Sequence, residues 1–356
     1  MEYCEDKLKL AYILGTGDSV NWSRFAYAQY ATNTDYLCNS VMVFEALHRL
    51  QSKAHRLLMY PSNYSHDELD PTRESWLLRK ARDEYGVKLV PIEVQRRDSG
   101  DSSWAGSYTK LLIFNQTQYD RVLGLDSDAT MLQHLDDLFL MPPAPVAMPR
   151  AYWLDQDKLF LTSLLLLVEP SKSEFDRVAG AILDAGPDDY DMDILNRLYR
   201  DSALVLPHRP NALLTGEFRS KSHSRYLGNP VEDWAPAKIL AEAKLVHFSD
   251  WPVPKPWIAA DSEMVAKHQP TCDLDPTTGQ DDCRSRDIWL GLYRDFADRR
   301  KVGIILIYVA AWPECSAACD GVWKWWKLYD EANTYNNPPG RNVFKRGRRG
   351  HVSPAS

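Results

Sequence analysis

The stretch that decides the fold is RVLGLDSD, residues 121–128, where an apolar strand runs straight into two aspartates, Asp126 and Asp128. In an open parallel sheet, ligands bind at the carboxyl ends of the strands. Two carboxylates one residue apart at such an end can both reach one hard cation, Mn²⁺ or Mg²⁺, because these ions accept oxygen ligands. Aspartates also cap helices and start turns, so the pair by itself fits a structural role too. The strand before it and the acidic turn HLDDLF at 134–139 favour the metal site.

Short β-rich runs alternate with helix-length amphipathic segments along the chain. We expect strands at residues 24–32, 56–60, 87–94, 121–125, 159–168 and 203–206. Helices are expected at residues 35–52, 67–85, 107–116, 173–184 and 191–200, with Gly86 as the cap of the second. This alternation predicts an α/β fold built on a mainly parallel sheet.

The composition is that of a folded, mildly acidic protein. The chain has 356 residues, 44% hydrophobic and 26% charged, with a formal net charge of −7. Its length allows one large domain or two ordinary ones, and the charge argues against a general nucleic-acid or membrane-surface binder. No apolar run reaches the roughly 18 residues of a membrane-spanning helix. The first twenty residues lack the apolar core of a signal peptide, so no membrane anchor is visible.

Cysteines and glycosylation sequons leave the cellular compartment open. Cys272 and Cys283 lie eleven residues apart without zinc-finger spacing, and a disulfide between them is possible. Three Asn-x-Ser/Thr sequons, at Asn21, Asn63 and Asn115, lean toward a secretory lumen.

A second candidate region is KLVHFSDWPVPKPW, residues 244–257. His247 ends an apolar strand-like run, where it could supply a third metal ligand, and Lys255 follows on a proline-rich loop suited to meeting a phosphate as a point charge. Taken alone, a histidine such as His247 is more often structural, and surface packing would explain the KPW segment at 255–257. Four tryptophans could stack on sugar rings, although packing is the ordinary role of this residue: Trp104, Trp153, Trp251 and Trp257.

Five blocks, taken together and in order, resemble the family 8 glycosyltransferases. They are ATNTDY (31–36), TKLLIFNQTQYDRVLGLDSD (109–128), HLDDLF (134–139), YDMDILN (190–196) and VHFSDWPVPKPW (246–257). The phrases WSRFAYAQYATNTDYLCNSVMVFEALHRL (22–50) and MYPS (59–62) are most similar to the fungal Golgi branch, which transfers N-acetylglucosamine. The resemblance covers roughly residues 24–260.

The resemblance implies a GT-A fold, a Rossmann-like sheet of the nucleotide-diphospho-sugar transferases with a smaller acceptor-side sheet. We expect this domain at residues 21–300, after a lead-in at 1–20. Residues 301–356 would form a C-terminal extension, of which about the last 20 residues are expected to be disordered.

The resemblance also implies a function and a set of site residues. The protein would be a metal-dependent, retaining glycosyltransferase that moves a sugar, N-acetylglucosamine by this resemblance, from a UDP-sugar to a glycan or glycoprotein acceptor. Mn²⁺ or Mg²⁺ would be bound by Asp126, Asp128 and His247. Lys255, which would hold the diphosphate, and Asp191, which would face the donor sugar or the acceptor, are the expected catalytic residues. The nucleotide-sugar would be bound by Ala31, Thr32, Asn33, Tyr36, Lys110, Ser127 and Thr162.

The chain departs from the family pattern at the sugar-recognition motifs. Thr162-Ser163-Leu164 stands where relatives carry Asn-Ser-Gly, and Asp191-Met192-Asp193 stands where glycogenin has Asp-Gln-Gly. The segment NALLTGEFRS (211–220), which matches the self-glucosylated region of glycogenin, contains no tyrosine, so self-glucosylation is not expected.

Several alternatives stay open. The enzyme could be a glycogenin-like or galactinol-synthase-like glucosyl or galactosyl transferase, or the chain could be an inactive nucleotide-sugar-binding protein. A glycoside hydrolase with two carboxylates would leave His247 and Lys255 unexplained. The resemblance implies the Golgi lumen, with the cytoplasm as the alternative.

Overall fold

The computed structural model describes residues 20–95, 106–154, 157–186, 188–274 and 279–311, with side-chain surroundings up to Lys301. The chain divides into two compact units, Met1–Ile307 and Tyr308–Ser356. The sheets and the candidate site lie in the first unit. Residues 1–19 of the predicted lead-in lie outside the described residues. The same holds for Trp104 and for the tail that was predicted to be disordered. The predicted division at residue 300 stays a prediction.

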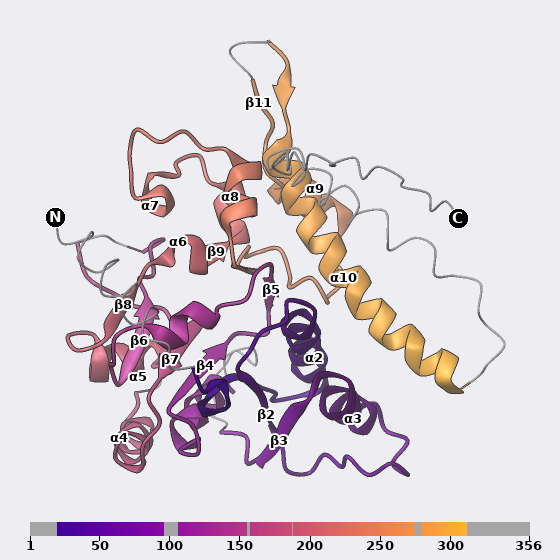
Figure 1. Cartoon of the computed structure of the whole chain (residues 1–356). Coiled ribbons are helices and arrows are strands. Elements are labelled where there is room, and N and C mark those ends of the chain that lie inside the picture. The colour runs from indigo at the N-terminus through magenta and orange to yellow at the C-terminus, as the bar shows by residue number, and fades with distance from the viewer. Residues whose placement is uncertain (1–19, 96–105, 155–156, 187, 275–278, 312–356) are drawn as a thin grey trace, which may run out of the picture. The chain divides into compact units, whose positions relative to one another are not determined.

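A seven-stranded sheet forms the centre of this unit (Figure 1). Its strands, in spatial order, are β3 (Val87–Ile92), β2 (His55–Pro61), β1 (Phe25–Tyr30), β4 (Arg121–Leu125), β7 (Leu165–Val168), β6 (Val146–Pro149) and β8 (Leu204–Leu206). The first four run parallel, β7 is antiparallel to both its neighbours, and β6 pairs with β8 in parallel. The α/β fold with a mainly parallel sheet, predicted from the sequence, is confirmed.

Successive residues of the central strands point into two different hydrophobic cores, as the two-residue period of a strand requires. In β4, Leu123 and Leu125 pack in the core that contains α2 (Thr34–Arg49) and α3 (Arg73–Tyr85). Val122 packs in the other core, with η2 (Ser107–Asn115), α4 (Lys172–Leu183) and α5 (Asp191–Tyr199). The sheet is therefore covered on both faces, and Figure 1 shows α2 with α3 on one side and α4 with α5 on the other.

A smaller, three-stranded sheet stands beside the carboxyl end of β4. It contains β5 (Ala129–Met131), β10 (Leu245–His247) and β9 (Leu213–Leu214), with β10 in the middle. β10 is antiparallel to β5 and parallel to β9. The smaller second sheet predicted with the GT-A fold is thus present.

Shorter elements complete the described part of the unit. They are η1 (Trp22–Arg24), η3 (Asp136–Leu140), α6 (His208–Asn211), η4 (Thr215–Arg219), α7 (Ser224–Leu227), α8 (Pro236–Glu242), α9 (Ser262–His268), β11 (Asp273–Leu274), β12 (Asp281–Asp282) and the start of α10 (Arg284–Ala311). A disulfide joins Cys272 to Cys283 across the β11–β12 hairpin. None of the helices within the described residues is long and apolar enough to span a bilayer.

The predicted helix cap at Gly86 is confirmed, whereas several predicted helix and strand boundaries differ from those of the structure. Gly86 ends α3 with φ +64°, in the left-handed region that glycine adopts without strain. The helix expected from residue 67 begins only at Arg73, because Asp67 and Asp70 use their side chains to accept backbone N–H groups in turns. Residues 107–115 form a 3₁₀ helix, and the strand expected from 159 begins at Leu165.

Candidate functional site

Two strands that are remote in sequence bring the acidic pair and a histidine together. Asp126 and Asp128 occupy the loop between β4, which ends at Leu125, and β5, which begins at Ala129. His247 is the last residue of β10, and its backbone pairs with Ala129. The backbone N–H of Phe248 then donates to the carbonyl of Asp128 at 3.0 Å. Strand pairing therefore fixes the imidazole beside the two carboxylates.

The three side chains converge on one point. His247 Nε2 lies 3.2 Å from Asp128 Oδ1 and 3.8 Å from Asp126 Oδ2. One ligand atom from each residue falls within 4.8 Å of the other two, and no second group of three acidic, histidine or cysteine side chains does so in the described part of the chain. Carboxylate oxygens and an imidazole nitrogen form a donor set that Mn²⁺ accepts. The residues present fit a divalent cation.

Lys255 completes this end of the site from the proline-rich loop. Its Nζ lies 2.7 Å from Asp128 Oδ2 and donates to the carbonyl of Phe248 at 2.5 Å. The ammonium group therefore meets the same carboxylate as His247, as a point charge with donors to spare.

A buried lysine connects the acidic pair to Asp191. Lys110 Nζ lies 2.7 Å from Asp126 Oδ1 and 3.0 Å from Asp191 Oδ2, and it donates to the carbonyl of Ser163 at 3.1 Å. The hydroxyl of Ser163 donates to Asp191 Oδ2 at 2.6 Å. Asp191, at the start of α5, is thus held to the same site through a cation and a hydroxyl.

The charges of the site do not cancel. Three carboxylates, those of Asp126, Asp128 and Asp191, face two ammonium groups, those of Lys110 and Lys255, which leaves one negative charge when the histidine is neutral (−3 + 2 = −1). A buried uncompensated charge is costly, so the site is electrostatically suited to an added cation.

The pKa directions agree with this charge balance. Burial works to lower the pKa of Lys110, but the carboxylates of Asp126 and Asp191 outweigh it and raise that pKa above its ordinary value. Burial likewise works to raise the pKa of Asp128, but His247 and Lys255 hold it well below its usual range. Burial raises the pKa of Asp126, against the opposing pull of Lys110. Lys110 therefore stays protonated and Asp128 stays ionised at neutral pH.

The segment expected to bind the nucleotide lies between β1 and α2. Ala31 is buried and its N–H donates to the carbonyl of Met59 at 2.9 Å. Asn33 caps α2, its side chain accepting from the N–H of Tyr36 at 3.1 Å. The Tyr36 ring meets the ring of Trp257 edge-on, with centroids 5.7 Å apart. Because β1 pairs with β4 in parallel, this segment leaves the sheet at the same edge as Asp126.

Three further residues were predicted to bind the nucleotide-sugar: Thr32, Ser127 and Thr162. Ser127 is buried between the two aspartates, and Thr32 packs against Gly106, where an added Cβ would come within 2.8 Å of the Thr32 methyl carbon. Thr162 is buried too, but its hydroxyl accepts from the N–H of Leu164 at 3.3 Å. Among the described residues Thr162 makes no hydrogen bond to Lys110 or Asp191, whereas its neighbour Ser163 makes one to each.

Two residues of this site were not predicted. Ser163 stands in the Thr162-Ser163-Leu164 segment, where the chain departs from the family pattern. Tyr30 ends β1; its hydroxyl donates to Asp126 Oδ1 at 3.3 Å and its ring lies 5.9 Å from Lys110 Nζ. The position of Tyr30 at the end of a predicted parallel strand was the signal that could have found it.

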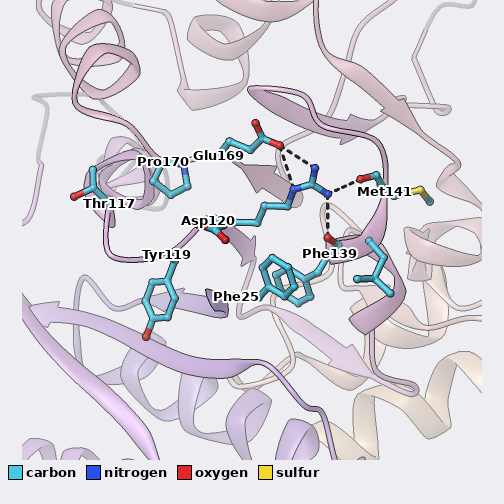
Figure 2. Close-up of a pocket in the computed structure, with 10 residues that line it drawn as sticks. Phe25, Thr117, Tyr119, Asp120, Phe139, Met141, Glu169 and Pro170 are labelled. Carbon is cyan, nitrogen blue, oxygen red and sulfur yellow. Dashed lines mark hydrogen bonds and ion pairs between the residues drawn. The ribbon is translucent and has the colours of Figure 1, made fainter. Parts of the chain in front are cut away.

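A separate hollow lies at the opposite edge of the sheet, where β1 and β4 begin (Figure 2). Arg121, the first residue of β4, pairs with Glu169 at 2.9 Å and donates to the carbonyls of Phe139 and Met141 at 2.9 and 2.5 Å. Figure 2 shows these contacts together with Phe25, whose ring stacks on that of Phe139. None of the predicted site residues lines this hollow.

The mainly parallel sheet, its smaller companion and the acidic cluster at the carboxyl edge are those of the GT-A fold, which is the fold class of this protein. No model of a known protein family matches the chain. The chain belongs to the fungal family of proteins named glucose N-acetyltransferase 1. It is 56% identical to the Gibberella zeae member over 291 residues, covering 79% of this chain and 63% of that protein, and 50% identical to the Aspergillus fumigatus member over 300 residues, covering 80% and 78%.

The match thus spans less than two thirds of the Gibberella protein. Solved structures similar to the chain include the galactosyltransferase LgtC in complex with donor and acceptor sugar analogues, with a TM-score of 0.46 and 16% identity over 66% of this chain and 89% of that one. Another is the glycosyltransferase GlyE of Streptococcus pneumoniae, with a TM-score of 0.47 and 16% identity over 76% and 60%. The resemblance to the fungal branch, predicted from the sequence, is confirmed by the identity to these two fungal proteins.

Proposed function

We propose that this protein is a metal-dependent, retaining glycosyltransferase that moves N-acetylglucosamine from a UDP-sugar to a glycan acceptor. The observation that carries the proposal is the convergence of Asp126, Asp128 and His247 at one point, with Lys255 on the same carboxylate. The name of the fungal relatives, glucose N-acetyltransferase 1, supports an N-acetylated sugar.

Asp126, Asp128 and His247 would hold the divalent ion, Mn²⁺ or Mg²⁺. When bound, the ion supplies electrostatic and Lewis-acid stabilisation of a diphosphate leaving group. The chain's own residues supply the remaining functions.

Lys255 stabilises the diphosphate. Its ammonium group stands next to Asp128, so a phosphate oxygen that enters there gains a positive point charge as the bond to the sugar breaks. The lysine is partly exposed and can leave the Phe248 carbonyl for a phosphate oxygen.

Asp191 orients and stabilises the donor sugar as positive charge develops at its anomeric carbon. One of its oxygens already accepts from Ser163 and Lys110, and the side chain is nearly fully buried. A carboxylate oxygen held by two donors is a poorer nucleophile but a well-positioned charge, so the geometry favours electrostatic stabilisation over covalent attack.

The nucleotide occupies the edge of the sheet beside α2. Ala31, Thr32, Asn33 and Tyr36 line the uridine pocket, and Ser127 lies over the ribose. Lys110 and Ser163 contact the donor sugar, and Thr162 lines the donor-sugar site next to Ser163.

The secretory lumen, and by the family resemblance the Golgi, is the proposed location. The disulfide between Cys272 and Cys283 suits an oxidising compartment. The three sequon asparagines, Asn21, Asn63 and Asn115, are all exposed, as acceptors of N-linked glycans must be.

The test measures UDP released from UDP-N-acetylglucosamine by the purified chain, with and without Mn²⁺. We expect Mn²⁺-dependent release that falls about 100-fold or more in Asp128→Asn, since that change removes a ligand charge. The matched control is Asp137→Asn, an exposed acid paired with Lys244 outside the site, which leaves the rate unchanged.

Two other outcomes would contradict the proposal. Faster turnover of UDP-glucose or UDP-galactose would assign a glucosyl or galactosyl transferase. Tight binding of UDP without turnover of any of the three donors would assign a nucleotide-sugar-binding protein, consistent with the altered motifs at 162–164 and 191–193.

A further inference from the structure

One tryptophan near the candidate site is almost entirely exposed. Trp251 has 91% of its surface in solvent. By contrast, Trp153 packs edge-on against Tyr152, and Trp257 packs between Tyr36 and Phe296. Tryptophan has a large apolar surface and is usually well buried. An almost fully exposed indole close in sequence to the candidate site therefore indicates a binding role.

The backbone on both sides of Trp251 is firmly held. The carboxylate of Asp250 is fully buried and accepts from Thr215 Oγ1, from Tyr293 Oη at 2.9 Å and from Arg219 Nη1 at 3.3 Å. The N–H of Val253, itself buried, donates to the carbonyl of Asp250 at 2.9 Å. The exposed ring is therefore carried by a rigid loop, and a ligand that stacks on it loses little to ordering of the backbone.

The length of the chain limits how far Trp251 can lie from the reaction centre. In the sequence it follows His247 by four residues and precedes Lys255 by four, and both of these residues contact Asp128. Four residues of chain span at most about 14 Å, so the Cα atom of Trp251 lies within that distance of both. One or two sugar rings cover such a distance.

We propose that Trp251 is the acceptor platform, on which a neutral pyranose ring of the glycan acceptor stacks while its hydroxyl reaches the donor sugar. The inference rests on the proposed function and extends it to the acceptor side. The face of a pyranose that carries axial C–H groups is apolar and matches the flat indole in size. A large rigid aromatic side chain supplies this contact at low entropic cost.

The charges of the loop favour a neutral sugar over a membrane surface. Residues 248–261, FSDWPVPKPWIAAD, contain one basic side chain, Lys255, and it is engaged with Asp128. Electrostatic adsorption to anionic lipid requires several basic groups, and this loop has one.

The experiment compares wild type with Trp251→Ala and Trp251→Phe in the presence of Mn²⁺ and UDP-N-acetylglucosamine. The acceptor probes are methyl pyranosides of glucose, galactose and mannose, and their linear di- and trisaccharides. We expect Trp251→Ala to raise the acceptor KM about tenfold or more, as for a central aromatic contact. The donor KM, the affinity for UDP and the hydrolysis of donor without acceptor should stay unchanged. Trp251→Phe, which keeps a ring, should stay within about threefold of wild type.

Leu69→Ala is the matched control. Leu69 is also 91% exposed but lies in the turn before α3, and its loss should alter none of these quantities. An unchanged acceptor KM in Trp251→Ala overturns the inference while leaving the proposed function intact.

If wild type transfers to none of the probes, saturation-transfer NMR of the same sugars on the UDP-loaded protein gives the answer. A signal that is lost in Trp251→Ala supports the platform even when the proposed transfer fails. No signal in wild type, or a signal equal in both proteins, overturns it. Loss of co-sedimentation with anionic vesicles in Trp251→Ala, with sugar binding unchanged, would assign the ring to a membrane and also overturn it.

Discussion

Lys110 and Asp126 form a buried ion pair, with Nζ 2.7 Å from Oδ1, at the end of the strand that decides the fold. The same ammonium group lies 3.0 Å from Asp191. One cation therefore joins the first aspartate of the metal cluster to the carboxylate that we assign to the donor sugar, and the consequences extend to both stability and activity.

Lys110→Met should destabilise the protein strongly at neutral pH. The change leaves the buried carboxylate of Asp191 and the largely buried one of Asp126 without their cation, and breaking a buried pair costs about 3–5 kcal/mol of the free energy of unfolding. Urea denaturation at pH 7 measures the loss. Lys172→Met, which removes an exposed lysine paired with Asp176, is the control and should change the free energy by less than about 0.5 kcal/mol. Equal effects of the two changes would mean that the buried pair has no special role.

His247→Ala should weaken Mn²⁺ binding without unfolding the protein. The imidazole supplies one of three ligand atoms, and its loss should lower the affinity at least about 10- to 100-fold, the range seen even for residues that only support ligands. Calorimetric titration with Mn²⁺ measures the affinity. His134→Ala, at a half-exposed histidine near η3, is the control. Undiminished affinity in His247→Ala would remove this residue from the ligand set.

Tyr293→Phe should loosen the loop that carries Lys255. The phenol donates to the buried carboxylate of Asp250, and a hydrogen bond to a charged group contributes about 1.5–3 kcal/mol. We expect a loss of that order in the free energy of unfolding and a higher donor KM, because the loop no longer holds its lysine in place. Lys255 itself stays intact, so a change in stability alone, with donor KM unchanged, would show that the network is only structural.

Asp295→Asn should stabilise the protein above about pH 4. Burial raises the pKa of this carboxyl against the opposing effect of Arg299 and Arg49, so the folded state disfavours its ionised form. A raised acid pKa lowers stability as the pH rises past the unfolded value of about 3.9, and the amide removes that loss. The difference between the variant and wild type should therefore be largest at pH 7 and vanish near pH 3. Asp201→Asn, at an exposed acid outside α10, is the control.

Much of the sheet could be predicted because its signals are local. The apolar run before Asp126 and the glycine after α3 each specify one feature through a few adjacent residues. Boundaries failed where side chains compete with the backbone, as at Asp67 and Asp70, whose turns delay α3.

The predicted site residues were found through family resemblance more than through spacing. No pattern of neighbouring residues in the sequence predicts that β10 pairs with β5. This pairing nevertheless places His247 beside Asp128. The choice between Thr162 and Ser163 depends on which hydroxyl points toward Lys110, and adjacent residues of similar chemistry cannot be told apart before the backbone direction is known.

The ladder between β5 and β10 has a consequence for how this protein can vary. The register of Ala129 with His247 is fixed by hydrogen bonds between the two strands, not by the length of chain that joins them. Changes of length confined to the loops between residues 132 and 244 can therefore leave the imidazole in place, whereas a slip of a single residue in that ladder would turn it to the opposite face. The loops between these strands can differ in length among relatives, but the alignment of the two strands cannot.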